Sequence, residues 1–381
     1  MGKISFPRTW ARPLRLPGLV AAGLGLTVTV TAAGLPSPHQ AQIADFRVLL
    51  SGVSADSADD AWAVGTPSTS GHVKAMHWNG TSWAKTAVPD VPGLRLVGVS
   101  ALAPDDAWAV GNAGAAAGGY RSLVLHWDGT SWTQVPSPRP HLRLLTSVSA
   151  DSSSDAWAVG SAQNATGGFR NLVLHWDGTR WTGVPAPSPS TSSLPELNSV
   201  SADSPSDAWA VGTYSPGKHR GASLALHWNG TSWRRVPIPT PGGAIINSLS
   251  SVTALSPSDA WAVGSSIAGG TEKAQVLHWD GTSWQEAPIP DPGSDSALSG
   301  VSAVSADDVW AVGGNASGNL VLHWNGAKWT TVASPALQNA FLTSVSAVSG
   351  SDAWAAGCVC VERSPARTVL LHWDGTSWTR S

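Results

Sequence analysis

The sequence predicts an all-β protein, a seven-bladed β-propeller of four-stranded antiparallel blades, and three observations carry this prediction. Two short motifs recur in step along the chain. Glycine (40), proline (27) and tryptophan (22) are abundant, which suits short strands joined by tight turns and packed through aromatic rings. Charged residues make up only 12% of the chain, and nothing in the composition suggests helices.

The internal repeat predicts the number of blades. The hexapeptide D-[A/V]-W-A-[V/A]-G occurs seven times, about 49 residues apart. It begins at Asp60, Asp106, Asp155, Asp207, Asp259, Asp308 and Asp352. A second motif, H-W-[D/N]-G-x-x-W, begins at His77, His126, His175, His227, His278, His323 and His372. Each copy therefore holds three tryptophans, and the only tryptophan outside the copies is Trp10.

One copy, residues 143–187, shows how four strands arise. Residues 143–150 predict a first strand, 156–162 a second, 171–176 a third and 181–185 a fourth, with a Gly-rich loop between the second and third. The Asp177-Gly178 pair supplies the positive φ that a tight hairpin turn requires. Because the side chains of the first strand are mostly small, as in S-V-S-A, we place this strand innermost, along a central channel. The fourth strand is placed at the outer edge.

The first 33 residues differ from everything after them. An uncharged apolar run, residues 19–30, follows four cations: Lys3, Arg8, Arg12 and Arg15. We interpret residues 1–33 as a signal peptide with an undetermined cleavage point, 34–45 as a linker and 46–381 as the propeller. A membrane anchor is the alternative, although the run is shorter than the roughly 20 residues that a spanning helix needs. The mature protein is therefore expected to be secreted, with no membrane span.

The invariant residues are interpreted as structural. Asp155 begins the second strand and His175 ends the third at the same end of the blade, so a hydrogen bond between them is expected. A catalytic pair is not needed seven times, whereas a latch in every blade is. In the hexapeptide, Trp157 and the valine point to one face and small residues to the other, so blades stack large on small. We assign Trp176 and Trp181 to the same packing.

Function is sought where the copies differ, on the loops from the second to the third strand and from the fourth strand to the next copy (the loop end). The opposite turns carry 17 aspartates against Arg180 and Lys328, which predicts an acidic face opposite a mildly basic loop end. The candidate ligand residues at the loop end are Tyr120, Arg121, Phe169, Arg170, Tyr214, Lys218, His219 and Arg220. Aromatic rings beside arginines form a platform for a sugar or an anionic group, and ordinary loop residues are the alternative.

The sequence predicts no cofactor, no metal site and no catalytic residue. Calcium binding by turn aspartates such as Asp151 and Asp155 is the alternative to solvated turn carboxylates. Zinc is not expected, because no second cysteine pair accompanies Cys358 and Cys360. Whether these two cysteines form a disulfide is left open, since an extended C-x-C places their Cα atoms near the limit of about 7 Å and a turn is required.

The paired motifs D-x-W-A-V-G and H-W-D-G-T-S-W resemble tectonin-type propeller repeats and are loosely similar to kelch and Asp-box repeats. The copies are longer than tectonin repeats, the kelch double glycine is absent, and D-G-T-S-W is one residue short of the Asp-box spacing. Tectonin-type proteins are lectin-like binders, so the resemblance implies recognition of carbohydrate or of a surface.

Two classes of function follow. The expected one is an exported, monomeric, non-catalytic binding module for a glycan, an anionic cell-envelope polymer or a protein, without nucleic acid as a partner. The alternative is a carbohydrate-active propeller enzyme, a glycosidase, lyase or oxidase. A glycosidase needs a carboxylate pair at the ligand face, and the few acids there are spread over several copies. Tyr120 and Tyr214 are the only tyrosines, which disfavours sialidase-like or copper-oxidase-like sites.

Overall fold

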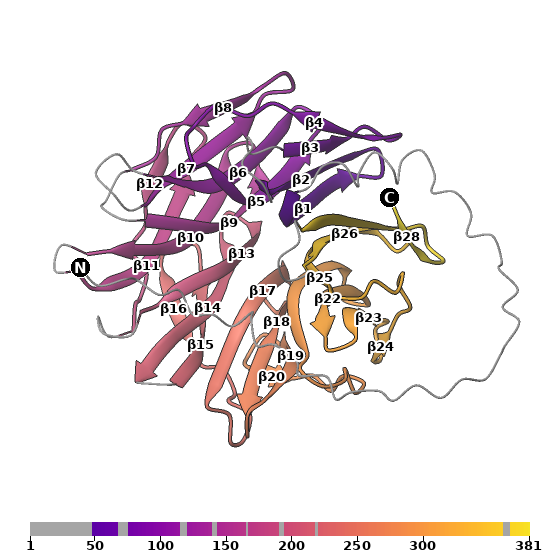
Figure 1. The fold of residues 1–381 in the computed structure, drawn as a ribbon. Helices are drawn as coiled ribbons and strands as arrows, with labels where there is room; N and C mark the ends of the chain where they lie inside the picture. Colours follow the sequence, from indigo (N-terminus) through magenta and orange to yellow (C-terminus); the bar gives the residue numbers. More distant parts are fainter. Residues whose placement is uncertain are drawn as a thin grey trace, which may run out of the picture. The chain divides into compact units, whose positions relative to one another are not determined.

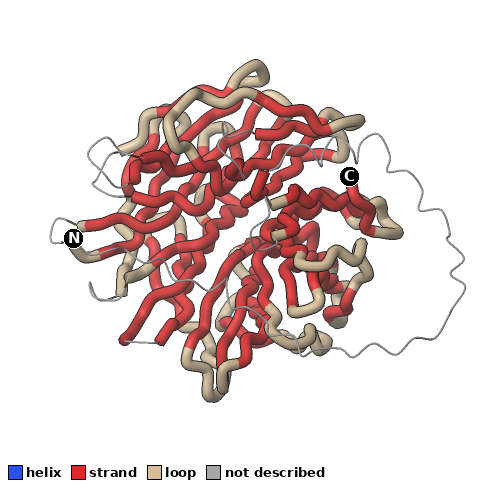
Figure 2. The backbone as a smooth tube through the Cα atoms, viewed as in Figure 1, coloured by secondary structure: helices blue, strands red, loops and turns tan. Residues whose placement is uncertain are grey.

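The computed structural model of the chain describes residues 48–67, 75–114, 120–138, 143–164, 167–189, 194–217, 220–360 and 366–381. The chain divides into two units, Met1–Pro36 and Ser37–Ser381, and every described residue belongs to the second. The predicted signal peptide and the predicted linker lie outside the described residues. The described chain consists of 28 strands joined by turns and loops, without a helix (Figure 2). Its residues accordingly include no helix long and apolar enough to cross a membrane.

Each sequence copy supplies four strands in order. The first strands are β1 (Val48–Ser57), β5 (Arg95–Ala103), β9 (Arg143–Ser152), β13 (Glu196–Ser204), β17 (Ile246–Ser256), β21 (Ala297–Ser305) and β25 (Ala340–Ser349). The second strands are β2 (Asp60–Pro67), β6 (Asp106–Gly114), β10 (Asp155–Gln163), β14 (Asp207–Gly217), β18 (Asp259–Ala268), β22 (Asp308–Asn315) and β26 (Asp352–Val359). The third strands are β3 (Ala75–Trp78), β7 (Tyr120–Trp127), β11 (Phe169–Trp176), β15 (Arg220–Trp228), β19 (Thr271–Trp279), β23 (Gly318–Trp324) and β27 (Arg367–Trp373). The fourth strands are β4 (Trp83–Thr86), β8 (Trp132–Val135), β12 (Trp181–Gly183), β16 (Trp233–Val236), β20 (Trp284–Glu286), β24 (Trp329–Thr331) and β28 (Trp378–Arg380).

The described strands form six sheets, in which the four strands of each copy run as an antiparallel meander. Five sheets have four strands in chain order, and the sixth has eight. In the eight-stranded sheet, the runs β13–β16 and β17–β20 are joined by one parallel residue pair, Gly221 with Ile246. The sheets therefore number six where the sequence predicts seven blades, and the predicted count is not confirmed by the sheets themselves.

The first strands form the inner wall of a closed ring (Figure 1). Each first strand contacts the first strands of the copies before and after it, and β25 contacts β1. A narrow channel of about 190 Å³ runs between them, and residues from all seven first strands line it. The ring closes by contact between the first and last copies, with β1–β4 and β25–β28 each forming a complete sheet and no strand shared between them.

Small hydroxyl side chains tie each first strand to the next. In every junction an alanine backbone N–H donates to a serine or threonine hydroxyl of the preceding copy, as Ala202 does to Ser149 at 3.1 Å. The last junction repeats the bond between Ala55 and Ser346 at 3.0 Å. The full set of hydroxyl residues is Ser54, Ser100, Ser149, Ser201, Thr253, Ser302 and Ser346. The plain S-V-S-A segment thus acts as the connection between copies.

The glycine that ends the hexapeptide is required by a close approach of two strands. A Cβ atom on Gly160 would lie 1.9 Å from the carbonyl oxygen of Leu144 on β9. The pairing of β9 with β10 shifts register at this glycine, because Thr146 is an extra residue between Leu145 and Ser147. The extra residue turns its hydroxyl to the next copy, where it donates to the Leu197 carbonyl at 2.6 Å.

A missing hydroxyl in the first copy offers a stability test. A second hydroxyl stands two residues before the serine that accepts from alanine. In the third copy Ser147 accepts from Val200 N at 3.2 Å, and in the seventh copy Ser344 accepts from Val53 N. Gly52 occupies this place in the first copy, and a Cβ there would meet Val99 N at an ordinary 3.5 Å. We expect Gly52→Ser to add the hydrogen bond and raise the free energy of unfolding by about 1 kcal/mol, measured by denaturant unfolding.

The matched control is Gly300→Ser at the same place in another copy. A Cβ on Gly300 would lie 2.9 Å from the Cα of Ser344, so the same substitution is obstructed by backbone. Gly300→Ser should give no gain or a loss. Equal effects of the two substitutions would contradict the role assigned to these hydroxyls.

The core consists of seven clusters, each lying between two successive copies, within the described chain. Trp62 and Val64 of one copy pack against Ala107 and Ala109 of the next. The last cluster joins Trp354 to Leu50 of the first copy. The alternation of large and small residues along the hexapeptide therefore buries one wide face against one narrow face at each junction.

Candidate functional site

The invariant Asp and His residues meet within each copy. His175 contacts Asp155, and in the fourth copy His227 Nε2 lies 2.5 Å from Asp207 Oδ1. The longest such pair, His372 with Asp352, is 3.4 Å. Each histidine ring also lies on the hexapeptide tryptophan of its own copy, as His175 does on Trp157 with centroids 4.3 Å apart. These seven equivalent pairs hold the third strand to the second at the turn end.

The tryptophans link neighbouring copies. Trp157 is fully buried and contacts Trp228 and Trp233 of the next copy, with centroids 4.9 and 5.1 Å apart. Trp176 and Trp181 make the same contacts backward, to Trp108. The indole N–H of Trp176 donates to the carbonyl of Ser153 in its own turn at 3.1 Å. The invariant tryptophans of the two motifs thus pack neighbouring copies against each other.

In three copies an aspartate also stands four positions before the motif aspartate: Asp56, Asp151 and Asp203. Three causes raise the pKa of Asp56 to about 6: first burial, then a hydrogen bond with Asp60, then the repulsion between the two carboxyl groups. Burial together with Asp207 raises the pKa of Asp203 to about 6, with Asp151 of the preceding copy contributing. The pKa of Asp151 is also raised, by burial and then by the charge and hydrogen bond of Asp155.

Calcium binding at Asp151 and Asp155 is the alternative that the sequence leaves for the turn aspartates. Within the described ranges, no group of three or more His, Cys, Asp and Glu side chains is placed to hold a metal ion. By contrast, Asp177 accepts from Thr179 N and Arg180 N at 3.0 and 2.9 Å in the hairpin turn. Bonds from the Thr179 hydroxyl and these N–H groups lower the pKa of Asp177 to about 2.

The predicted ligand residues that the structure describes lie on strands rather than in loops. The sequence places Phe169 and Arg170 before the third strand, whereas β11 begins at Phe169 and pairs it with Gln163. Tyr120 begins β7 at the equivalent place and is 39% exposed. The strands extend because backbone pairing continues beyond the apolar pattern. Of the remaining candidates, Arg121 and Arg220 are exposed strand residues, Tyr214 lies within β14, and Lys218 and His219 lie outside the described residues.

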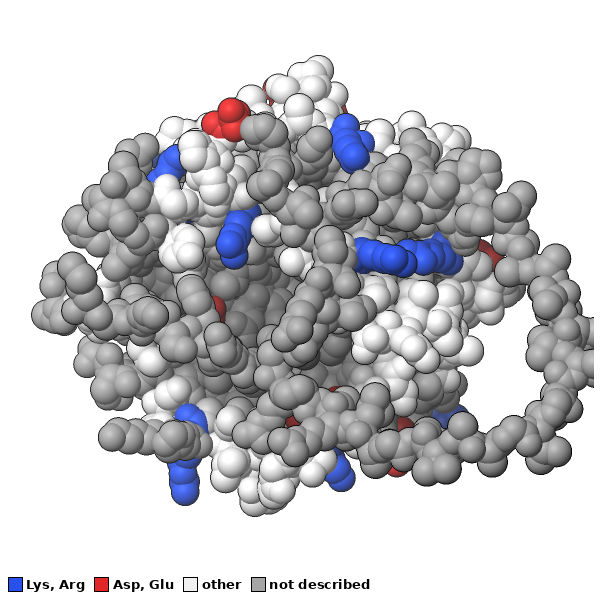
Figure 3. All heavy atoms as spheres, viewed as in Figure 1, with Lys and Arg blue, Asp and Glu red and all other residues white. Residues whose placement is uncertain are grey.

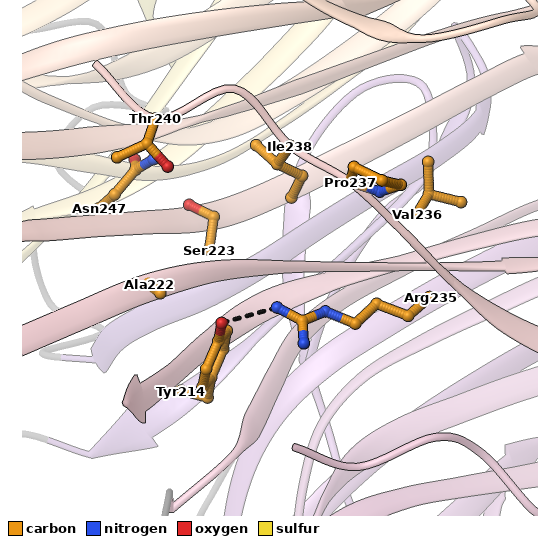
Figure 4. Close-up of a pocket in the computed structure, with 9 residues that line it drawn as sticks. All are labelled: Tyr214, Ala222, Ser223, Arg235, Val236, Pro237, Ile238, Thr240 and Asn247. Atoms are coloured by element: carbon orange, nitrogen blue, oxygen red, sulfur yellow. Dashed lines mark hydrogen bonds between the residues drawn. The ribbon is translucent and has the colours of Figure 1, made fainter. Parts of the chain in front are cut away.

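Tyr214 lines a cavity of about 370 Å³ at the loop end of the fourth copy (Figure 4). Its phenol oxygen accepts a hydrogen bond from the Arg235 guanidinium at 2.6 Å, and that guanidinium lies 4.8 Å from the ring centroid. Arg235 comes from β16, and the opposite wall comes from the connection to the next copy and from β17. The complete lining is Tyr214, Ala222, Ser223, Arg235, Val236, Pro237, Ile238, Thr240 and Asn247.

Ser223, which lines the cavity, stands where two other copies carry a longer side chain. In the third copy, Asn171 fills the place of Ser223 and donates to the Pro187 carbonyl in the following connection at 2.6 Å. In the sixth copy, Asn319 donates to Ser334 in the same way at 2.6 Å. Ser223 is too short for such a bond, and its buried hydroxyl has no hydrogen-bond partner in the structure. At Ser223 the third strand therefore lacks the side-chain bond to the following connection that Asn171 and Asn319 make.

Sequence reasoning missed Arg235, because nothing in the chain order ties the fourth strand to Tyr214. Register explains the contact: Tyr214 pairs with Ala222 and Arg235 pairs with Leu226, so alternate residues of β15 carry both partners on one face. A usable signal was the place of Tyr214, since no other copy has an aromatic residue two positions after the hexapeptide glycine.

A disulfide joins Cys358 to Cys360, with Cα atoms 5.7 Å apart. This answers the question that the sequence left open. Cys358 is buried near the end of β26, and Cys360 follows the strand, with its N–H donating to the Asn339 carbonyl at 3.0 Å. The two Cα atoms are closer than in a fully extended C-x-C segment and lie inside the range that a disulfide needs.

The described Lys and Arg side chains on the face drawn in Figure 3 are mostly spaced apart rather than gathered into one patch. Arg121, Arg170 and Arg220 are each exposed but belong to three different sheets. The candidate residues therefore do not form one common site in the described chain. Of the described candidates, Tyr214 lines a cavity.

Comparison with solved structures identifies the fold. YCF48 bound to D1 peptide is similar with a TM-score of 0.54 and 17% sequence identity, over 86% of this chain and 92% of that one. YCF48 from Cyanidioschyzon merolae is similar with a TM-score of 0.55 and 16% identity, over 86% and 96%. Both are β-propeller proteins. This chain has the β-propeller fold.

No family model matches the propeller sequence. No curated protein matches it either. At 16 to 17% identity, the likeness to the YCF48 propellers shows the fold alone. The resemblance to tectonin-type repeats therefore stays a prediction.

Proposed function

We propose that this propeller is an exported, non-catalytic binding protein that recognises a glycan, a cell-envelope polymer or a protein at its loop end. We also propose that it has seven blades, with the runs β13–β16 and β17–β20 counted separately because a single residue pair joins them. A lectin-like role, as the tectonin-type resemblance implies, is part of the proposal.

The observation that carries the binding role is the cavity beside Tyr214. Its volume of about 370 Å³ lies in the range of roughly 300–1,000 Å³ usual for small-molecule sites. It is lined by one cation, one phenol, one amide, two hydroxyls and several apolar side chains. None of the described residues that line it is a carboxylate, so they do not offer the pair of acids that glycoside hydrolysis uses.

Two further observations support the proposal. The Cys358–Cys360 disulfide is a bond that persists in oxidising compartments, in keeping with export. One similar propeller, YCF48, has been solved with a bound peptide, which keeps a protein partner among the candidates.

The test is an array of glycans, cell-envelope polymers and peptides probed with the purified full-length chain. We expect a defined ligand whose binding weakens about tenfold in the double variant Arg220→Gln/Arg235→Gln and falls with added salt, because the variant removes the cation that lines the cavity and the exposed arginine at the start of β15. The control, Arg180→Gln/Lys328→Gln, removes the same charge from the turn end and should bind normally. No ligand from any class, equal loss in both variants, or turnover of a bound glycan would contradict the proposal.

A further inference from the structure

Among the described residues, Arg235 is the only charged one that lines the cavity, and its guanidinium is held in place. One of its nitrogens donates to the Tyr214 hydroxyl at 2.6 Å, while the guanidinium carbon lies 4.8 Å from the ring centroid. Figure 4 shows the two side chains meeting across the lower part of the cavity. Tyr214 therefore positions the guanidinium. Because the guanidinium is planar, this bond also fixes the directions of the remaining N–H groups of Arg235.

The same bond decides what Tyr214 offers to a ligand. A guanidinium has donors and no acceptor, so the phenol oxygen must accept from Arg235. The phenol hydrogen is then available to donate elsewhere. An arginine N–H and a tyrosine O–H held side by side present two donors, which match the two oxygens of a carboxylate.

The rest of the cavity suits a sugar ring rather than a bare ion. Val236, Pro237 and Ile238 provide an apolar wall that can cover the C–H face of a pyranose. Thr240 adds a hydroxyl group, and Asn247 is buried and held by a bond from Gln275 at 2.6 Å. Apolar cover with a few fixed polar groups is the usual composition of a small-ligand site.

We infer that this cavity binds a sugar residue that carries a carboxylate, a uronate, with the carboxylate against Arg235 and Tyr214. This inference rests on the proposed binding function and names its ligand class and its site. A neutral sugar has no carboxylate to pair with the Arg235 guanidinium, so the cavity should bind a neutral sugar more weakly than a uronate.

The experiment is calorimetric titration of the full-length chain with glucuronate and galacturonate oligosaccharides, and with neutral glucose and galactose oligosaccharides of equal length. We expect uronate binding at least about tenfold tighter than neutral binding. Arg235→Gln should remove most of that preference. Tyr214→Phe, which keeps the ring but loses the hydroxyl, should weaken uronate binding about threefold to tenfold.

Two controls separate a binding role from a general effect. Arg234→Gln changes the adjacent exposed arginine, on the other face of β16, and should leave uronate affinity unchanged. Ser223→Asn copies Asn171 and should fill the cavity and abolish binding without loss of melting temperature. Equal affinity for uronate and neutral sugars, or equal loss in Arg234→Gln and Arg235→Gln, would overturn the inference.

The outcomes also separate this inference from the proposed function. If uronates fail while a sulfated glycan, a neutral glycan or a peptide binds and depends on the loop end, the propeller is a binding protein and the uronate assignment is wrong. If nothing in the full array binds, the proposed function itself fails.

Discussion

Replacing Trp157 with alanine should lower the free energy of unfolding by about 4 kcal/mol, the loss expected for a large buried aromatic residue. Trp157 is fully buried, contacts two tryptophans of the next copy and lies on His175 of its own. The cavity left between two sheets has rigid walls of β-structure on both sides. We therefore expect a marked fall in melting temperature, measured by calorimetry and circular dichroism.

The control for this prediction is Tyr120→Ala, an aromatic truncation at a strand end that is 39% exposed. It should change stability by less than about 0.5 kcal/mol. If Trp157→Ala melted at the wild-type temperature, the stacking of copies through their tryptophans could not be the main source of stability.

Replacing the three extra turn aspartates with leucine should stabilise the protein at neutral pH. The triple variant Asp56→Leu/Asp151→Leu/Asp203→Leu copies the second and fifth copies, which carry Leu102 and Leu255 at the same place. Both leucines are partly buried against core clusters, so a leucine fits there. We expect the free energy of unfolding to rise by about 2–3 kcal/mol near pH 7, after allowance for solvent screening. The reason is that the repulsion between the two carboxyl groups of each pair is removed.

The pH dependence of this gain follows from the raised pKa values. Asp56 and Asp203 have pKa values of about 6 in the folded protein, above the ordinary 3.8, so the folded state binds protons more tightly than the unfolded state between these values. Their protonation favours folding at pH 4, and this contribution is lost as the pH rises through about 6. The difference between variant and wild type should therefore be small at pH 4 and largest at pH 7 to 8.

The hairpin aspartates act in the opposite direction and cancel in the comparison. Asp128, Asp177, Asp280 and Asp374 have pKa values lowered to about 2, chiefly by the following threonine hydroxyl. Their contribution is present above the ordinary value and is lost as the pH falls toward 2, equally in both proteins. Denaturant unfolding of the two proteins from pH 4 to 8 measures the difference. A gain that does not change with pH would contradict the carboxyl pairing.

Much of the fold was predictable because it is written in local patterns. The positions of the seven hexapeptides, the order of four strands in each copy and the packing of Trp157 against small residues all follow from alternation and turn chemistry. The hydrogen bond between Asp155 and His175 was predictable for the same reason, since register places both residues at one end of adjacent strands. Strand ends were less predictable, as the early start of β11 at Phe169 shows.

The sequence by itself determined the repeat, the four-stranded antiparallel unit and the large and small faces of each second strand, because each depends on neighbouring residues with a period of two. Only the tertiary structure decided that Arg235 reaches Tyr214, that Cys358 bonds to Cys360 and that a cavity lies beside Tyr214. These features depend on how a fourth strand, a turn and the connection to the next copy meet in space. The loop-end site therefore depends on Tyr214, an aromatic residue that one copy alone places two positions after the hexapeptide glycine, and repeated motifs cannot reveal such a feature.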